Sequence, residues 1–309
     1  MDYEALRMVC SWEFWRMAVL WTISLLYSYI LLFIRRGGGG APVPRRCRRP
    51  MPEPDDDAGR CLRPICVITG ATSGLGKAAA VALAQEGYHV VLGESRTVQE
   101  IRNRQSDAYL EAFQVNLSSF KSIKKFETSL KQWIQDANME HSIQLLVNNA
   151  GMLAKSYRIT EDGFDDETYH MISRMMQANY IGPFVLTNIL LPLLKNSSTP
   201  SRVVNLTAAD PGVVQTGIMR ELPPSLSWFA HSVLRLLNLL QQPDTGVGAV
   251  LDAALAPPEA SGKYFFGGKG RTIRSSQLSY DVEVAKKLWA ESLALFNELQ
   301  IRECELRTS

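Results

Sequence analysis

Cysteine and histidine are scarce in this chain. The 309 residues include five cysteines at irregular spacing and four scattered histidines, none of which pairs with another at helical spacing. An odd number of irregularly spaced cysteines is typical of a reduced chain without a disulfide framework. Cys61 and Cys66 have no second pair of cysteines or histidines to complete a zinc site, so we expect no metal.

Strong net charge and internal repeats are also lacking. The formal net charge is +2, which argues against general nucleic-acid binding. Apolar residues make up 46% of the chain, an ordinary share for a protein with a real core. The length suits one large α/β domain with an appendage.

An uncharged apolar run occupies residues 17–34, between Arg16 and the pair Arg35 and Arg36. As a helix, about 18 residues span roughly 27 Å, enough for a thin bilayer. A signal peptide is the alternative, but its apolar region is usually ~7–15 residues and a small-residue cleavage site should follow. The sequence predicts a single-pass anchor at 17–34 after a short N-terminal segment, 1–16. The arginines on its C-terminal side place the main domain in the cytosol.

Residues 35–62 are rich in arginine, glycine and proline, which predicts a linker with little prospect of packing. Cys47 lies among these arginines, where acylation and a plain linker thiol are the two interpretations. The folded domain is predicted at residues 63–302, and a tail at 303–309.

Short apolar segments alternate with helical patterns in the predicted domain. Strands are expected at 65–68, 88–92, 108–117, 143–147 and 202–206. An alanine-rich helix is expected at 77–86 and a long helical stretch at 171–195. This alternation indicates a parallel, doubly wound α/β sheet.

The turn after the first strand carries the pattern Gly-x-x-x-Gly-x-Gly. Gly70 allows a sharp turn, Gly74 lets backbone N–H groups approach a pyrophosphate, and Gly76 permits close helix–strand packing. The next helix would present its N-terminus to the phosphates. A Walker-type loop is excluded, because counting back from Lys77 puts Ala71 where that motif requires glycine.

Three further motifs follow in order: Asn148-Asn149-Ala150-Gly151, Asn179-Tyr180-x-Gly182-Pro183-Phe184 and Pro211-Gly212-x-x-x-Thr216. With the glycine turn, they make the chain resemble the short-chain dehydrogenase/reductase family. The resemblance covers about residues 63–302 with one interruption. It is closest to the membrane-anchored branch of retinol-dehydrogenase-like and WW-domain-oxidoreductase-like proteins. It implies a Rossmann fold, oxidoreductase activity, and NAD or NADP as cofactor.

The resemblance also implies which residues contact the cofactor. They are Gly70, Thr72, Ser73, Gly74, Leu75, Gly76, Glu94, Arg96, Asn116, Asn148, Ala150, Gly151, Pro211, Gly212 and Thr216. Asn148 would have a structural role, Gly151 would face the ribose, and Thr216 would contact the nicotinamide carboxamide. Asn179 matches an auxiliary catalytic asparagine, although without its partner lysine an ordinary polar helix residue is the preferred interpretation.

The choice between NAD and NADP stays open. Glu94, at the end of the second strand, would bond the ribose 2′-OH and favour NAD. Arg96 could instead hold a 2′-phosphate, while Ser95 stands where related reductases often carry that arginine. Asn116 replaces the usual aspartate near the adenine, and its amide oxygen can still accept a hydrogen bond.

The catalytic pair of the family, a tyrosine with a lysine four residues later, is missing. None of the ten tyrosines has this partner. Ala208 stands where the family has the serine that polarises the substrate carbonyl, and Pro211 follows after only Ala209 and Asp210. The family inserts several tens of residues here, with the Tyr-x-x-x-Lys helix, part of the dimer surface, and the next strand.

This interruption predicts both a chemical and a structural loss. General acid–base catalysis contributes ~10²–10⁴-fold and oxyanion-type polarisation a similar factor, so activity should fall near background. No residue is assigned as catalytic. The sheet should be incomplete after the fifth strand, with an unpaired edge and an unstable, aggregation-prone or partner-dependent fold. The abrupt join suggests an alternative splice form or a faulty gene model.

Residues 222–240 are very apolar. In the family this region covers the substrate, which implies a lipophilic alcohol or carbonyl; a helix resting on a membrane is the other interpretation. The sequence thus predicts a membrane-anchored NAD(P)-dependent oxidoreductase, at the endoplasmic reticulum or plastid envelope, that is inactive in this form. A non-catalytic nucleotide-binding or interaction protein at a membrane is the alternative.

Overall fold

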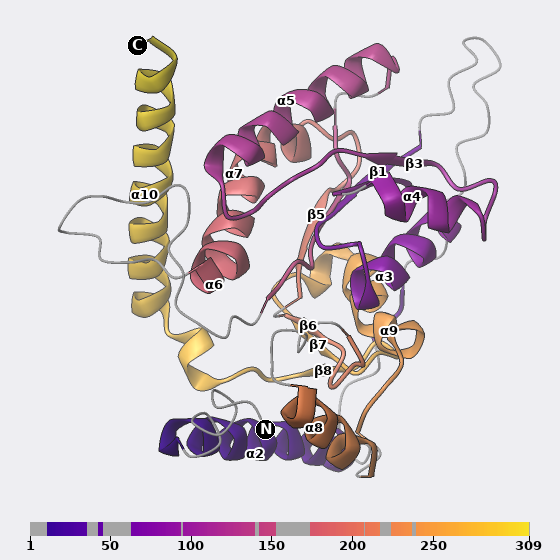
Figure 1. The fold of residues 1–309 in the computed structure, drawn as a ribbon, viewed down its shortest axis with the longest axis vertical. Coiled ribbons are helices and arrows are strands. Elements are labelled where there is room, and N and C mark those ends of the chain that lie inside the picture. Colours follow the sequence, from indigo (N-terminus) through magenta and orange to yellow (C-terminus); the bar gives the residue numbers. More distant parts are fainter. Residues whose placement is uncertain are drawn as a thin grey trace.

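The computed structural model describes residues 11–35, 43–45, 63–93, 95–139, 142–152, 174–206, 208–216, 224–236 and 239–308. Its centre is a five-stranded parallel sheet in the order β3-β2-β1-β4-β5 (Figure 1). The strands are β1 (Ile65–Ile68), β2 (His89–Leu92), β3 (Leu110–Ala112), β4 (Leu145–Asn148) and β5 (Arg202–Asn205). The doubly wound parallel sheet expected from the sequence is confirmed.

Helices cover both faces of this sheet, which explains why β1 and β4 are buried along their whole length. On one face lie α3 (Gly74–Gln85), α4 (Ser95–Arg102) and α9 (Pro243–Ala254). On the other lie α5 (Phe120–Asp136) and α7 (Gly182–Lys195). The short helix α6 (Arg174–Met176) and a π-helical turn (Gln177–Ile181) lead into α7.

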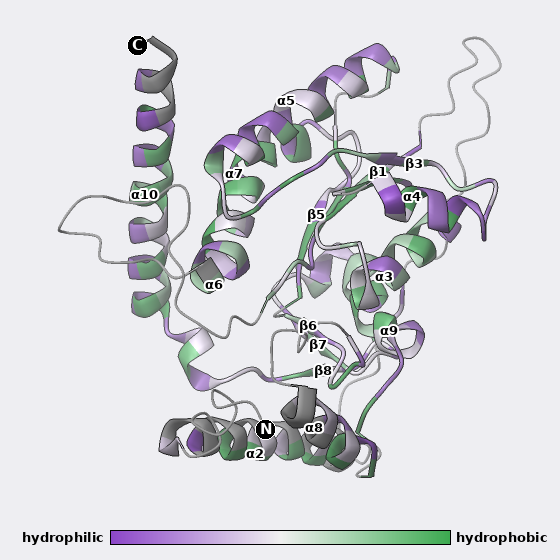
Figure 2. Cartoon of the chain, viewed as in Figure 1, coloured by the Kyte–Doolittle hydropathy of each residue, from purple (hydrophilic) through white to green (hydrophobic). Residues whose placement is uncertain are grey.

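A long C-terminal helix, α10 (Val282–Thr308), runs beside α7 (Figure 1). Phe296 and Leu299 are buried in the same core as α5 and α7. The Ser292 and Tyr180 hydroxyls are hydrogen-bonded at 2.8 Å. Figure 2 shows polar and apolar residues alternating along α10, as expected for a helix with one packed side.

The parallel sheet stops at β5, as the sequence led us to expect. A second, three-stranded sheet follows, made of β6 (Ala209–Asp210), β7 (Tyr264–Phe266) and β8 (Thr272–Ile273). β6 pairs in parallel with β7, and β7 is antiparallel to β8. Within the described residues, β5 has a strand partner only on its β4 side.

The N-terminal helix α2 (Trp12–Arg35) lies near this second sheet, beside α8 (Pro224–Leu236) (Figure 1). The Tyr29 ring meets Phe266 edge-on, with 5.4 Å between ring centroids, and also packs with Val213 and Leu234. Among the described residues, no helix has both the length and the apolarity needed to cross a membrane. The spanning helix predicted at 17–34 therefore finds no support in the structure.

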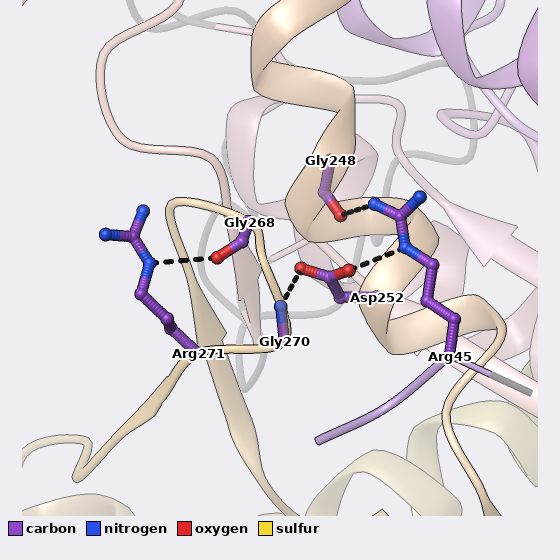
Figure 3. Close-up of polar contacts among 6 residues, drawn as sticks. All are labelled: Arg45, Gly248, Asp252, Gly268, Gly270 and Arg271. Atoms are coloured by element: carbon purple, nitrogen blue, oxygen red, sulfur yellow. Dashed lines mark hydrogen bonds and ion pairs between the residues drawn. The ribbon is translucent and has the colours of Figure 1, made fainter. Parts of the chain in front are cut away.

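Two residues of the predicted linker, Val43 and Arg45, contact the domain, and Figure 3 shows Arg45 beside Asp252. The Val43 N–H donates to the Gly270 carbonyl at 2.9 Å. Arg45 Nε contacts Asp252 Oδ1 at 2.7 Å, and Asp252 Oδ2 accepts from the Gly270 N–H at 2.7 Å. The prediction of little packing is wrong for Val43 and Arg45. Asp252 is only 2% exposed, and a buried carboxylate needs a cation or hydrogen-bond donors, which Arg45 and Gly270 supply.

Candidate functional site

A cleft of about 570 Å³ opens at the carboxyl ends of β1 to β4. Its walls are the loops that follow these strands, together with Ala178 of the π-helical turn. The lining residues named by the sequence are Gly70, Thr72, Asn116, Ala150 and Gly151. In open parallel sheets this edge, where the strand order reverses, is where ligands bind.

The glycine turn at the cleft tolerates no side chain. Gly70 has φ of +64°, and an added Cβ would lie 2.6 Å from the Ala150 Cα. A Cβ on Gly76 would lie 2.3 Å from both Asn149 Nδ2 and the Gly70 carbonyl oxygen. Both positions are therefore restricted to glycine by backbone conformation, close approach or both.

The turn leads directly into α3, whose N-terminus has no internal cap. Ser73 is the extended N-cap residue, but its side chain makes no capping hydrogen bond, and the first turn has no acidic residue. The leading N–H groups of a helix carry partial positive charge and favour an anion. The turn and helix therefore fit a dinucleotide pyrophosphate. Leu75 is buried in the core below them.

A hydrogen-bond network fixes the loop after β4 to the loop after β1. Thr69 Oγ1 accepts from the N–H groups of Asn149 and Ala150, each at 3.1 Å. Asn149 Nδ2 donates to the carbonyl oxygens of Thr69 and Gly70, at 2.8 and 2.9 Å. The cofactor set expected from the sequence omits Asn149. The position of Asn149 in the Asn-Asn pair is the sequence feature that could have indicated its role.

Asn148 joins β4 to two neighbouring elements. Its Nδ2 donates to Asn205 Oδ1 at 2.9 Å and to Thr187 Oγ1 of α7 at 3.1 Å. Its Oδ1 is buried and has no hydrogen-bond partner in the described part of the chain. These contacts join β4 to β5 and to α7, while the role of Asn148 in holding a cofactor stays a prediction.

Of the residues expected near the adenosine, only some line the cleft. Ser95 and Asn116 line it, and Asn116 Oδ1 accepts from the Ser118 N–H at 3.0 Å. Arg96 is 85% exposed and lies 3.8 Å from Glu100 Oε1. Glu94 lies outside the described residues. The geometry of the described residues leaves the choice between NAD and NADP open.

Asn179 clamps the loop at the mouth of the cleft. Its Oδ1 accepts from the Met152 N–H and its Nδ2 donates to the Met152 carbonyl, both at 2.9 Å. The residue lies on the π-helical turn, which the sequence pattern did not predict. Both polar atoms of the amide thus position Met152, which lines the cleft.

The segment expected near the nicotinamide lies beyond the end of β5. Thr216 approaches the glycine turn, since a Cβ on Gly74 would lie 3.0 Å from Thr216 Cγ2. Pro211 and Gly212 instead contact Gln241 and Tyr29, and neither lines the cleft. Ala208, at the position of the expected serine, has no hydroxyl.

Tyr264 does not replace the missing tyrosine. Its hydroxyl donates to Asp210 Oδ2 at 2.7 Å. Burial, with the charge and hydrogen bond of Asp210, raises the pKa of Tyr264 above its ordinary value. Catalysis by a tyrosinate requires the opposite shift.

Comparisons with known proteins identify the same family. The family model described as short chain dehydrogenase matches residues 64–223. Retinol dehydrogenase 13 from Homo sapiens is 27% identical over 74% of this chain and 83% of its own length. Polyprenol dehydrogenase from Homo sapiens is 25% identical over 84% and 93%, respectively. The Arabidopsis thaliana dehydrogenase/reductase SDR family member FEY is 32% identical over 46% and 37%.

The alignments also indicate residues that this chain lacks. The alignment to retinol dehydrogenase 13 has 296 positions and includes 74% of this 309-residue chain. Because that share amounts to fewer than 296 residues, some of the positions are gaps in this chain. Among solved structures, 3-oxoacyl-[acyl-carrier protein] reductase from Brucella melitensis, in complex with NAD, matches with a TM-score of 0.50. It is 17% identical and covers 69% of this chain and 99% of its own, a likeness of fold alone.

Proposed function

Because this chain belongs to the short-chain dehydrogenase family, we propose that it binds NAD or NADP in the cleft at the carboxyl ends of β1 to β4. One observation carries the proposal. A turn closed to side chains at Gly70 and Gly76 runs into the uncapped N-terminus of α3 beside this cleft. That arrangement suits a pyrophosphate. The bound nicotinamide would supply or accept the hydride.

The chain's own residues would hold and orient the dinucleotide. Backbone N–H groups at Ser73 and Gly74 would meet its phosphates, and Thr216 would lie near its nicotinamide end. Asn148 and Asn179 act as positioning residues, since each fixes backbone or side chains around the cleft. Asn116 would face the adenine.

We propose further that turnover is near background in this form. The chain has no Tyr-x-x-x-Lys pair, and Ala208 replaces the polarising serine. Burial and Asp210 raise the pKa of Tyr264, which is the wrong direction for a catalytic tyrosinate. Loss of proton transfer alone removes about 10²–10⁴-fold of rate.

The substrate class we propose is a lipophilic alcohol or carbonyl. The relatives named retinol dehydrogenase and polyprenol dehydrogenase act on such molecules. The apolar residues 222–240 support this class, and within them Leu234 of α8 is buried while Trp228 is exposed. A membrane location would suit these substrates. The exposed apolar side chains of α2, Ile23 and Leu26 among them, support attachment at this end of the chain.

The experiment is a fluorescence titration of the purified chain with NADH and NADPH, followed by an assay with retinal and the same cofactors. We expect saturable binding without turnover. Gly76→Ala should weaken binding at least tenfold, since its Cβ has no room. Gly248→Ala is the matched control: its Cβ would make only ordinary contacts, the nearest at 3.6 Å.

Three results would contradict the proposal. Absence of binding by a folded chain would remove the cofactor assignment. Equal binding by the Gly76 and Gly248 variants would show that the dinucleotide does not bind at the turn. Retinal reduction that Gly76→Ala abolishes would show that the chain retains the family's enzymatic activity after all.

A further inference from the structure

A second hollow, of about 750 Å³, lies along the open edge of β5. We name it the β5 groove. It is lined by β5, by Ala208 and Ala209, and by the segment from Pro258 to Phe265, with Tyr280 at one side. It shares no lining residue with the cofactor cleft.

In the described residues, strand pairing satisfies the backbone of β5 on its β4 side only. The N–H groups of Arg202 and Leu206 donate to carbonyls of the β4 side, at 2.9 and 3.1 Å. Successive residues of a strand direct their backbone groups to opposite edges, so Val203 and Asn205 direct theirs into the β5 groove. The Asn205 carbonyl accepts from the Ala208 N–H at 2.8 Å. The N–H and C=O of Val203 and the N–H of Asn205 remain directed at the groove.

The opposite wall of the groove, formed by β7, does not pair with these backbone groups of β5. β7 is paired on both sides, since the Phe265 N–H donates to the Ala208 carbonyl and the Phe266 N–H to the Arg271 carbonyl. Val203 is 37% exposed, whereas Val204 on the opposite face is 4% exposed. Among the residues that the structure describes, the edge therefore has no second neighbouring strand, and Val203 is left partly exposed. Unpaired edges of this kind accept extended segments.

The charge of the groove restricts its occupant. Arg202 and Lys263 line it, and no carboxylate does. The Arg202 guanidinium already donates to the Ala253 and Ala256 carbonyls. Lys263 is exposed, and no carboxylate in the described part of the chain lies within ion-pair distance of it. A partner with an acidic residue would complement this ammonium group.

We propose that the β5 groove binds an extended peptide segment of another protein, which adds to β5 as a strand. The segment carries apolar side chains at alternate positions, to cover Val203, and an acidic residue that pairs with Lys263. Main-chain hydrogen bonds to Val203 and Asn205 hold it, and the charge pair selects it.

Hydrogen exchange of the backbone amides tests the strand addition. The probe is the synthetic peptide acetyl-Asp-Val-Thr-Val-Thr-Val-Asp-amide. At saturation it should slow exchange at Val203 and Asn205 at least tenfold, while Arg202 and Val204, which face β4, change little. Unchanged exchange at Val203 and Asn205 overturns the proposal. So does slow exchange there without peptide in a chain that sediments as a dimer, because a second copy would then be the occupant.

Charge exchange tests the pairing with Lys263. Lys263→Glu should weaken a fluorescein-labelled form of the same peptide about threefold to tenfold, and a peptide with lysine in place of aspartate should regain that loss. Lys195→Glu, an exposed site on α7 outside the groove, makes the same change in net charge and should leave affinity within twofold. If both variants weaken peptide binding equally, the change in net charge explains the loss, and the selective pairing with Lys263 is overturned.

Discussion

The centre of the parallel sheet and its β5 edge differ in how completely their strands are enclosed. β1 and β4 have strands on both edges, helices on both faces, and residues that are buried throughout. β5 has one paired edge, and two of its four residues are exposed. The cofactor cleft belongs to the enclosed centre and the β5 groove to the open edge. An interruption of the parallel sheet after β5 therefore leaves the glycine turn between β1 and α3 assembled.

The largest effect should come from a substitution in the enclosed centre. Leu146→Ala removes a fully buried side chain of β4 and should lower the free energy of unfolding by about 3 kcal/mol. Urea unfolding followed by far-UV circular dichroism measures it. Leu278→Ala, at an exposed position, should change it by less than about 0.5 kcal/mol. If the two variants are equally stable, the enclosed centre is not packed as described.

A smaller effect is expected on acidification. His89 begins β2, with its ring edge-on to Trp133, and burial, followed by the charges of Arg63 and Arg102, lowers its pKa from 6.5 to about 4. Between these pH values the unfolded chain binds more protons, so the folded state loses stability as pH falls from about 6.5 to 4. After allowance for solvent screening we expect about 1–2 kcal/mol.

Unfolding of the chain and of His89→Phe, measured from pH 7.5 to 4, isolates this contribution. The difference in stability between the two proteins should change across this window. A constant difference would show that His89 titrates normally and does not contribute to the loss of folding stability on acidification.

The smallest effect should come from the open edge. Val203→Ala should change the free energy of unfolding by less than about 0.5 kcal/mol, because its side chain is partly in solvent. Val147→Ala, the same substitution in fully buried β4, should cost about 2 kcal/mol. Thermal unfolding of both variants gives the comparison. A loss at Val203 as large as that at Val147 would mean that the edge is covered in solution.

The local features of this fold were predictable from sequence. β1 begins and ends where its apolar run does, and the glycine spacing located the turn whose side-chain exclusion the structure displays. The jump from Ala208 to Pro211 predicted the interruption after β5. Each of these follows from neighbouring residues in the chain.

Contacts between distant residues were not predictable. Arg45 looked like one of many linker arginines, yet its partner Asp252 is 207 positions away. The clamp between Asn179 and Met152 depends on a π-helical turn that the apolar pattern does not encode. The contacts of the Asn149 side chain were not predictable either, because the resemblance implies roles only for its neighbours Asn148 and Ala150.

The turn from Asn205 to Ala208 has a consequence for how the protein can change. The Ala208 N–H closes it on the Asn205 carbonyl, and Phe265 then holds the Ala208 carbonyl. Added length would enter at the chain's boundary between two sheets, just past Asn205, whose side chain accepts from Asn148. Insertion at this joint would therefore lengthen the passage from one sheet to the other without altering the order of the five parallel strands.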